Sequence, residues 1–208
     1  MTAYAEQKDI IVLVADRNME FSAKGILNRH QSLDIRPVTY DIRVHPGHDP
    51  ACLRQSHSFL QAFIKRYAYA LVIFDREGCG KDKASRETLE EAVEKRLAEN
   101  GWRDRSAAIV LNPELEIWIW SDSPHVSRIL GWSRKSPGLR HWLTAEGFLK
   151  EGQTKPRRPK EAVENALEIV KKARSSSLYF QIAQKVSFNR CDDPAFLKLR
   201  TTLKKWFG

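Results

Sequence analysis

The sequence predicts an α/β fold, in which a mostly parallel sheet is flanked by helices and followed by a helical, basic C-terminal extension. Three continuous apolar runs, at 10–15, 71–74 and 107–111, predict strands that are buried on both faces. Segments with helical spacing separate them, as in strand–helix–strand crossovers. Residues 131–208 hold 17 Lys and Arg against seven Asp and Glu, whereas residues 1–130 hold 18 against 19. We therefore expect an α/β domain over 1–130 and a basic helical region over 131–208.

Composition places the chain among globular proteins. It has 208 residues, of which 42% are hydrophobic and 10% aromatic, which favours a packed core over disorder. No apolar run approaches the length of a membrane span, and the start, MTAYAEQKD, is polar where a secretion signal would be apolar. We expect a cytoplasmic protein without a membrane partner. The three widely spaced cysteines fit neither a disulfide framework nor a zinc site, and Cys79 is interpreted as a small packing residue.

Periodicity and breaker residues predict the remaining elements. The helix predicted over 83–100 carries Glu90, Glu91 and Glu94, which we assign to its solvated face. Asp192 or Asp193, followed by Pro194, predicts the N-cap of the last helix. The other expected elements are a strand within 33–45, a helix or strand over 113–120, and helices over 19–27, 52–69, 160–174, 179–186 and 195–207.

Acidic residues follow each of the three apolar strands. They are Asp16 with Glu20, Asp75 with Glu77, and Glu114 with Glu116. Ligands of open α/β sheets bind at the carboxyl ends of the strands, and neighbouring strand ends lie about 5 Å apart. Converging carboxylates repel one another unless a cation joins them, and oxygen ligands favour Mg²⁺ or Mn²⁺. The pattern therefore predicts metal-dependent phosphodiester chemistry; the alternative is that each carboxylate caps or solvates its own loop.

A loop rich in Pro and Gly offers a second candidate set of metal ligands. His45, His48 and Asp49 lie in the segment HPGHDP. Histidines in such a loop are more often ordinary surface residues, and we prefer that interpretation.

Two of the acidic motifs resemble a known domain. Asp16-Arg-Asn-Met-Glu20 after one strand and Asp75-Arg-Glu77 after another are similar to the Toprim domain, the metal-binding module of topoisomerases, primases and the OLD and RloB-like nucleases. The segment Pro113-Glu-Leu-Glu-Ile-Trp118 resembles small Toprim-like proteins of bacterial defence loci, and the C-terminal tail is similar to the ending of those proteins. The Toprim resemblance covers roughly residues 8–125.

The resemblance implies roles for individual residues. Asp16, Asp75 and Glu77 fall on the metal-binding positions, while Glu20 and Glu116 match further acidic positions that complete the site, one of them as general base. Three departures stand out. Asp16 replaces a glutamate, Glu77 replaces an aspartate, and Arg17 stands where the family has glycine. These changes keep oxygen ligands but alter their reach.

Together these observations predict a Mg²⁺- or Mn²⁺-dependent, Toprim-like nuclease in a methylation-associated anti-phage defence system. The basic C-terminal region would hold the backbone of nucleic acid, DNA being expected, through Arg157, Arg158, Lys204 and Lys205. Other defence proteins are expected partners, and homodimerisation is left open. The alternative is a degenerate, non-catalytic Toprim-fold subunit that binds nucleic acid or partner proteins. A third idea is a phosphatase or nucleotide-processing enzyme.

Overall fold

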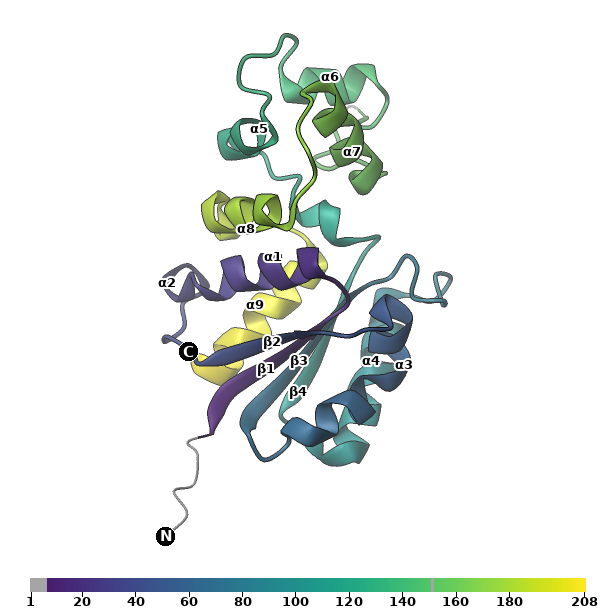
Figure 1. Cartoon of the computed structure of the whole chain (residues 1–208), viewed down its shortest axis with the longest axis vertical. Coiled ribbons are helices and arrows are strands. Elements are labelled where there is room, and N and C mark those ends of the chain that lie inside the picture. The colour runs from purple at the N-terminus through teal and green to yellow at the C-terminus, as the bar shows by residue number, and fades with distance from the viewer. Residues whose placement is uncertain (1–6, 151) are drawn as a thin grey trace.

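The computed structural model describes residues 7–150 and 152–208, and its centre is a sheet of four parallel strands in the order β2-β1-β3-β4 (Figure 1). The strands are β1 (Lys8–Val14), β2 (Tyr40–Val44), β3 (Tyr67–Asp75) and β4 (Ser106–Leu111). The three predicted apolar strands are confirmed, and so is the α/β class with a parallel sheet. The strand expected within 33–45 is confirmed over a shorter stretch, because the backbone is extended into the sheet only from Tyr40.

The order of the strands creates a switch point between β1 and β3. From β1 the chain moves outward to β2 on one side, and then returns to β3 and β4 on the other. Val14 is level with Ile73 on β3 and with Val44 on β2. The carboxyl ends of the strands therefore form one edge, and open α/β sheets bind ligands where the strand order reverses.

Helices cover both faces of the sheet. In Figure 1, α1 and α9 lie on one face and α3 and α4 on the other. Both faces are apolar because the central parts of β1, β3 and β4 (residues 10–14, 70–74 and 107–111) consist of buried Val, Ile, Leu, Ala and Phe. The helices of this core are α1 (Arg17–Leu27), α2 (His30–Leu33), α3 (His48–Leu60), η1 (Gln61–Phe63), α4 (Arg86–Leu97), the wide turn η2 (Ala98–Trp102) and α9 (Pro194–Phe207).

The C-terminal region forms a cap of helices and then returns to the sheet. Its elements are η3 (Leu115–Trp118), α5 (Pro124–Leu130), α6 (Leu139–Ala145), α7 (Pro159–Ile169), α8 (Ser176–Lys185) and η4 (Phe188–Arg190), before α9. In Figure 1, α8 lies on α1, with α5, α6 and α7 beyond it. The predicted N-cap is confirmed, since the Asp193 carboxylate accepts from Phe196 N at 3.1 Å. The segment 113–120 resolves as the short helix η3.

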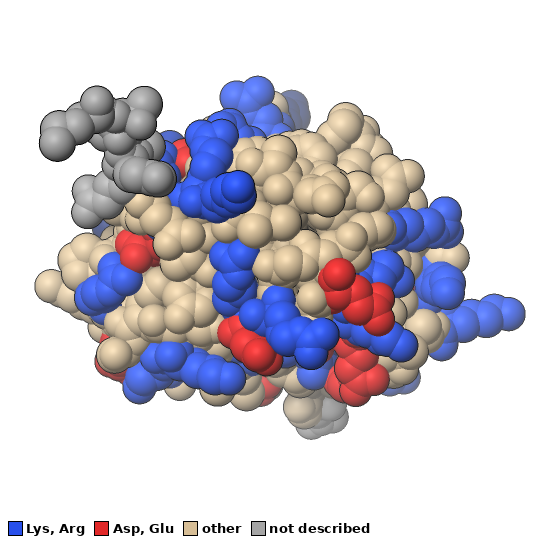
Figure 2. All heavy atoms as spheres, turned by 90° about the horizontal axis from the view of Figure 1, so that it is seen from below, with Lys and Arg blue, Asp and Glu red and all other residues tan. Residues whose placement is uncertain are grey.

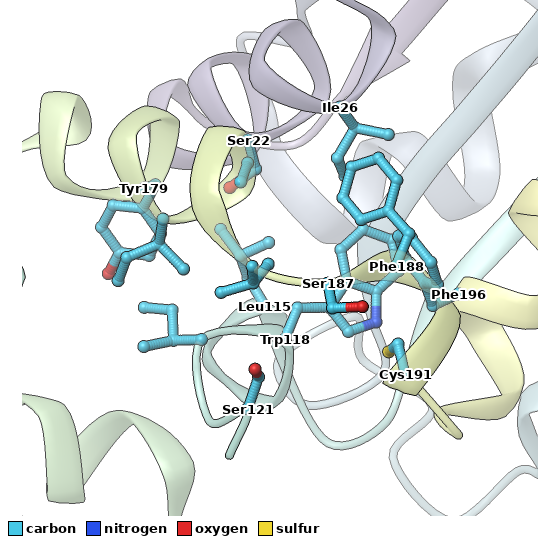
Figure 3. Close-up of a pocket in the computed structure, with 14 residues that line it drawn as sticks. Ser22, Ile26, Leu115, Trp118, Ser121, Tyr179, Ser187, Phe188, Cys191 and Phe196 are labelled. Carbon is cyan, nitrogen blue, oxygen red and sulfur yellow. The ribbon is translucent and has the colours of Figure 1, made fainter. Parts of the chain in front are cut away.

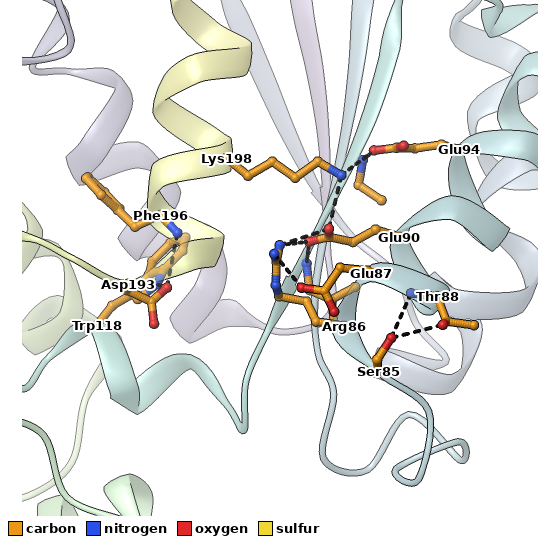
Figure 4. Close-up of polar contacts among 12 residues, drawn as sticks. Ser85, Arg86, Glu87, Thr88, Glu90, Glu94, Trp118, Asp193, Phe196 and Lys198 are labelled. Carbon is orange, nitrogen blue, oxygen red and sulfur yellow. Dashed lines mark hydrogen bonds and ion pairs between the residues drawn. The ribbon is translucent and has the colours of Figure 1, made fainter.

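The outer edge of β4 is closed by side chains of α4 (Figure 4). In β4 the amides of Ala108 and Val110 point away from β3, and they donate to the carboxylates of Glu94 (2.9 Å) and Glu90 (3.0 Å). Lys198 of α9 then pairs with both carboxylates. The prediction that Glu90 lies on a solvated face is wrong, because the residue is 3% exposed and its carboxylate takes the place of a neighbouring strand.

At the amino ends of the strands, charges of both signs are mixed. Asp9 at the start of β1 pairs with Arg36, and Asp34 pairs with Arg200 and Lys204 of α9. Figure 2 views the molecule from this end and shows blue side chains with red ones among them, around a broad tan area. Separately, the described helices include none with the length and apolar character needed to cross a bilayer.

Candidate functional site

The carboxyl edge brings the predicted acids of β1 and β3 together. Asp16 follows Val14 by two residues and Asp75 follows Ile73 by two, and Val14 and Ile73 are in register on adjacent strands. The two carboxylates therefore start from the same level of the sheet, about 5 Å apart in backbone position. Asp16 is also the N-cap of α1, with its Oδ1 accepting from Met19 N at 2.8 Å. The capping alternative is thus confirmed for one oxygen of Asp16.

Asp49, which the sequence offered only as part of a second candidate ligand set with His45 and His48, is a member of this edge. It lies in the first turn of α3, the helix that follows β2, and its Oδ1 accepts from the backbone N of Asp75 at 2.8 Å. Burial raises the pKa of its carboxyl group, and the charge of Asp16 raises it further. The expectation that the histidines of the HPGHDP loop are ordinary surface residues is wrong for His45, which is 6% exposed, whereas His48 is exposed. The available signal was the position of Asp49 just past a strand, matching that of Glu20.

The third pair, Glu114 and Glu116, accepts hydrogen bonds from residues of the C-terminal helical region. Glu116 is 2% exposed and accepts from Arg174 Nη2 at 2.5 Å and from the Tyr179 hydroxyl at 2.6 Å. Glu114 accepts from Lys160 N at 3.0 Å, in the first turn of α7. Both carboxylates are therefore compensated, one by a guanidinium and one by a helix N-terminus. The sequence gives no signal for Arg174 or Tyr179, which lie about 60 residues away along the chain.

Asp75 lies at the centre of these groups. Burial raises the pKa of its carboxyl group well above the usual value, and four neighbouring acids raise it further: Asp49, Glu116, Asp16 and Glu114. Its Oδ1 is fully buried and has no hydrogen-bond donor within the described chain. We call Asp16, Asp49, Asp75, Glu114 and Glu116 the acidic cluster. Every other member accepts a hydrogen bond from a named donor, so Asp75 is the carboxylate left without compensation.

Glu77 and Glu20 lie at the margin of the acidic cluster. Glu77 is exposed, and it raises the pKa of Glu114, so it lies close enough to interact. Gly78, at a φ of 84°, turns the chain directly after it. Glu20 is half-buried in the first turn of α1, and it is not among the charges that act on Asp75.

The acidic cluster offers ligand atoms for a hard cation without a closed cage. In residues 7–150 and 152–208, no three His, Cys, Asp or Glu side chains lie close enough to surround an ion. Mg²⁺ is usually held by one or two carboxylates, with waters and substrate phosphates completing its shell. Asp75, whose Oδ1 has no donor in the described chain, could meet that requirement together with one neighbouring carboxylate, Asp16 or Asp49.

The four predicted nucleic-acid contacts divide between two places. Arg157 and Arg158 precede α7, whose first turn binds Glu114, so they lie on the side of the acidic cluster. Arg157 is exposed, whereas Arg158 pairs with Glu161 at 2.7 Å. Lys204 and Lys205 lie at the end of α9, beside the amino ends of the strands. Trp206, next to Lys205, stacks on Tyr69 with ring centroids 4.6 Å apart. Tyr69 and Asp75 are six residues apart on β3, which is about 20 Å along the strand, so these lysines lie far from the acidic cluster.

An apolar cavity of about 40 Å³ adjoins the acidic cluster through Tyr179, which lines the cavity and donates to Glu116 (Figure 3). Its lining includes Ile26 of α1, Trp118 of η3, Tyr179 of α8, and Phe188, Cys191 and Phe196. None of the predicted site residues lines it. Its position is where α8 and η4 pack against α1 and η3.

No protein-family model, curated protein or solved structure matches the chain.

Proposed function

We propose that the chain is a metal-dependent, Toprim-like nuclease that hydrolyses phosphodiester bonds of nucleic acid in bacterial phage defence. The observation that carries the proposal is Asp75 Oδ1, which is buried, has no donor within residues 7–150 and 152–208, and lies in a carboxylate whose pKa four other acids raise. An uncompensated carboxylate in such a place is costly unless it is protonated or joined by a cation. The resemblance of the Asp16 and Asp75 motifs to the Toprim domain supports the same chemistry, and only the resemblance supports the role in defence.

We assign metal binding and proton transfer to different residues of this edge. Asp75 would hold the ion together with Asp16 or Asp49, each of which has one carboxylate oxygen in a hydrogen bond and the other available as a ligand. A bound Mg²⁺ or Mn²⁺ would polarise the phosphodiester and lower the pKa of an attacking water. Glu77, exposed at the rim, is placed to accept the proton from that water. Glu20, the other candidate for this role, is half-buried and is not among the main charges that raise the pKa of Asp75.

Glu116 is better suited to positioning than to proton transfer. Its carboxylate is buried, and its donors are Arg174, just before α8, and Tyr179, within α8. It therefore fixes the cap helices against the carboxyl edge. Arg157 and the first turn of α7 lie on this side and are the nearest predicted contacts for a nucleic-acid backbone. Lys204 and Lys205 would be reached only by a substrate that extends along the molecule for about 20 Å.

Cleavage by purified protein tests the proposal. Labelled duplex DNA, single-stranded DNA and RNA are incubated with Mg²⁺ or Mn²⁺, and with EDTA as a blank. We expect metal-dependent cleavage that falls at least 100-fold in Asp75→Asn and in Asp49→Asn. Asp104→Asn is the matched control: Asp104 is exposed at the amino end of β4, at a φ of 61° that asparagine tolerates. Absence of cleavage of all three substrates in both metals would refute the nuclease proposal.

A non-catalytic subunit of a defence complex is the second candidate. The compensation of Glu116 by Arg174 favours it, because one of the acids expected in the site is already satisfied by the protein. In that case nucleic acid would be retained without divalent metal and without cleavage, and partner proteins of the defence system would bind the acidic edge. The cleavage assay, run beside a filter-binding measurement in EDTA, separates the two candidates. In either case we expect the protein to act in the cytoplasm.

A further inference from the structure

The two outer edges of the sheet differ in whether their outward backbone amides are hydrogen-bonded. At β4, the outward amides of Ala108 and Val110 are bound by carboxylates of α4, so that edge cannot accept another strand. At β2, within the described chain, no side chain binds an outward amide. Open edges of this kind pair readily with a further strand, and proteins usually block them.

The groups exposed on the β2 edge can be identified from the ladder. Ile10 N donates to Thr39 O, and His45 N donates to Val14 O, so residues 39 and 45 direct their peptide groups toward β1. Because these groups alternate along a strand, Tyr40, Ile42 and Val44 direct theirs away from the sheet. Within residues 7–150 and 152–208, each of these three residues has one N–H and one C=O without a partner. In Figure 1, β2 is the front strand and no ribbon crosses before it.

The strand is complementary to a second copy of itself. If two β2 strands pair antiparallel about a two-fold axis at Ile42, then Tyr40 lies opposite Val44, Ile42 opposite Ile42, and Asp41 opposite Arg43. Aromatic with β-branched, β-branched with β-branched and acid with base are the favourable cross-strand pairs. The outward groups of Tyr40, Ile42 and Val44 are the ones that this pairing would bond. Arg43 is exposed and has no ion-pair partner in the described chain, and Asp41 Oδ1 is free of the contacts that Lys8 and Tyr67 make with Oδ2.

We infer that the chain forms a homodimer through antiparallel pairing of β2 with β2, which joins two four-stranded sheets into one continuous sheet. The contact is isologous, so every pair across it occurs twice. The two acidic clusters then point in opposite directions, since the strands of the two copies run antiparallel. Each cluster is complete within its own chain, and the dimer is therefore independent of the proposed nuclease activity.

Charge exchange tests this geometry. Arg43→Glu places two acids opposite each other twice, and Asp41→Lys does the same with two bases. By sedimentation equilibrium we expect the wild-type chain to dimerise and each variant alone to dimerise at least about tenfold more weakly. An equimolar mixture restores opposite charges at both positions, so a heterodimer of wild-type strength is expected. Arg54→Glu on α3 is the control, because it makes the same charge change away from β2.

Three results would overturn the inference. They are a wild-type chain that stays monomeric at every concentration measured, a dimer that neither variant weakens, and variants that are not rescued by mixing. Asp41→Lys loses the contacts with Lys8 and Tyr67, so its folding is checked by circular dichroism. If it does not fold, hydrogen exchange at Ile42 decides: its amide must become more protected as concentration rises in the wild type, and not in Arg43→Glu. Protection that does not depend on concentration would also refute the pairing.

Discussion

Replacement of Glu90 by alanine should destabilise the protein strongly, although the residue lies on a helix with a charged sequence. Its carboxylate accepts from Arg86 at 2.8 and 2.9 Å, from Val110 N at 3.0 Å, and from Lys198 at 3.1 Å. The side chains of Glu90 and Arg86 are 4% and 15% exposed, so water cannot replace the lost carboxylate. Removing one partner of a buried ion pair is strongly unfavourable because it leaves the other charge uncompensated.

The magnitude follows from these contacts. Loss of the buried pair costs about 3–5 kcal/mol, which includes the unsatisfied amide of Val110. For a chain of this size, the corresponding fall in melting temperature is about 10 °C. Glu90→Gln keeps an acceptor for the amide and for one guanidinium N–H, and loses only the charge, so about 1–2 kcal/mol is expected. Lys198 contributes less to the difference, because it keeps Glu94 at 2.7 Å.

Urea unfolding of the two variants measures these values. Glu91→Ala is the matched control: Glu91 is exposed one position along the same helix, and its loss should change the free energy of unfolding by less than about 0.5 kcal/mol. Glu90→Ala also frees the amide of Val110, so unlike Glu91→Ala it should increase self-association through the β4 edge. A cost below about 1 kcal/mol for Glu90→Ala would refute the idea that its carboxylate replaces a neighbouring strand.

Three further outcomes are expected. Without divalent ions, Asp75→Asn should raise the free energy of unfolding by about 1–3 kcal/mol, because it removes a buried charge without a donor, whereas Asp104→Asn should leave it unchanged; thermal unfolding in EDTA measures both. Tyr179→Phe should lower the free energy of unfolding by about 1–2 kcal/mol, because Glu116 loses a buried donor. Urea unfolding measures this change. The pKa of Asp9 is lowered to about 2, chiefly by its bond to Arg36, so its contribution of about 1 kcal/mol is present above pH 4 and lost as pH falls toward 2; Asp9→Asn should remove that slope from the pH profile of stability.

The parts of the fold that were predicted are those that local patterns determine. The run Leu71–Phe74 is apolar on both faces, so only a strand buried between helices satisfies it, and the structure confirms this. The last helix was predictable for the same reason, since Phe196, Leu199 and Leu203 recur on one side and are buried. Asp193 with Pro194 marked its start, and that signal is also local.

The wrong assignments concern residues whose partners are distant in the chain. Glu90 has the local sequence of a solvated residue, and its burial depends on Val110 and on Lys198, which is 108 residues away. His45 lies in a loop by composition, yet it packs against Phe59 with ring centroids 4.9 Å apart. Periodicity carries no information on such contacts, because they are fixed by how α4, α9 and the sheet come together.

The acidic cluster raises the question of why one carboxylate is left uncompensated. The fold supplies donors to its other members from the N-termini of α1 and α7, from the backbone of β3, and from Arg174 with Tyr179. These donors come from both the α/β core and the cap, so the omission at Asp75 is not due to a shortage of donors. A carboxylate needed only for a turn would have been easy to satisfy or to replace by asparagine. The proposed metal-dependent activity would require Asp75 to stay free of donors, because an N–H directed at it would compete with the cation for the same oxygen.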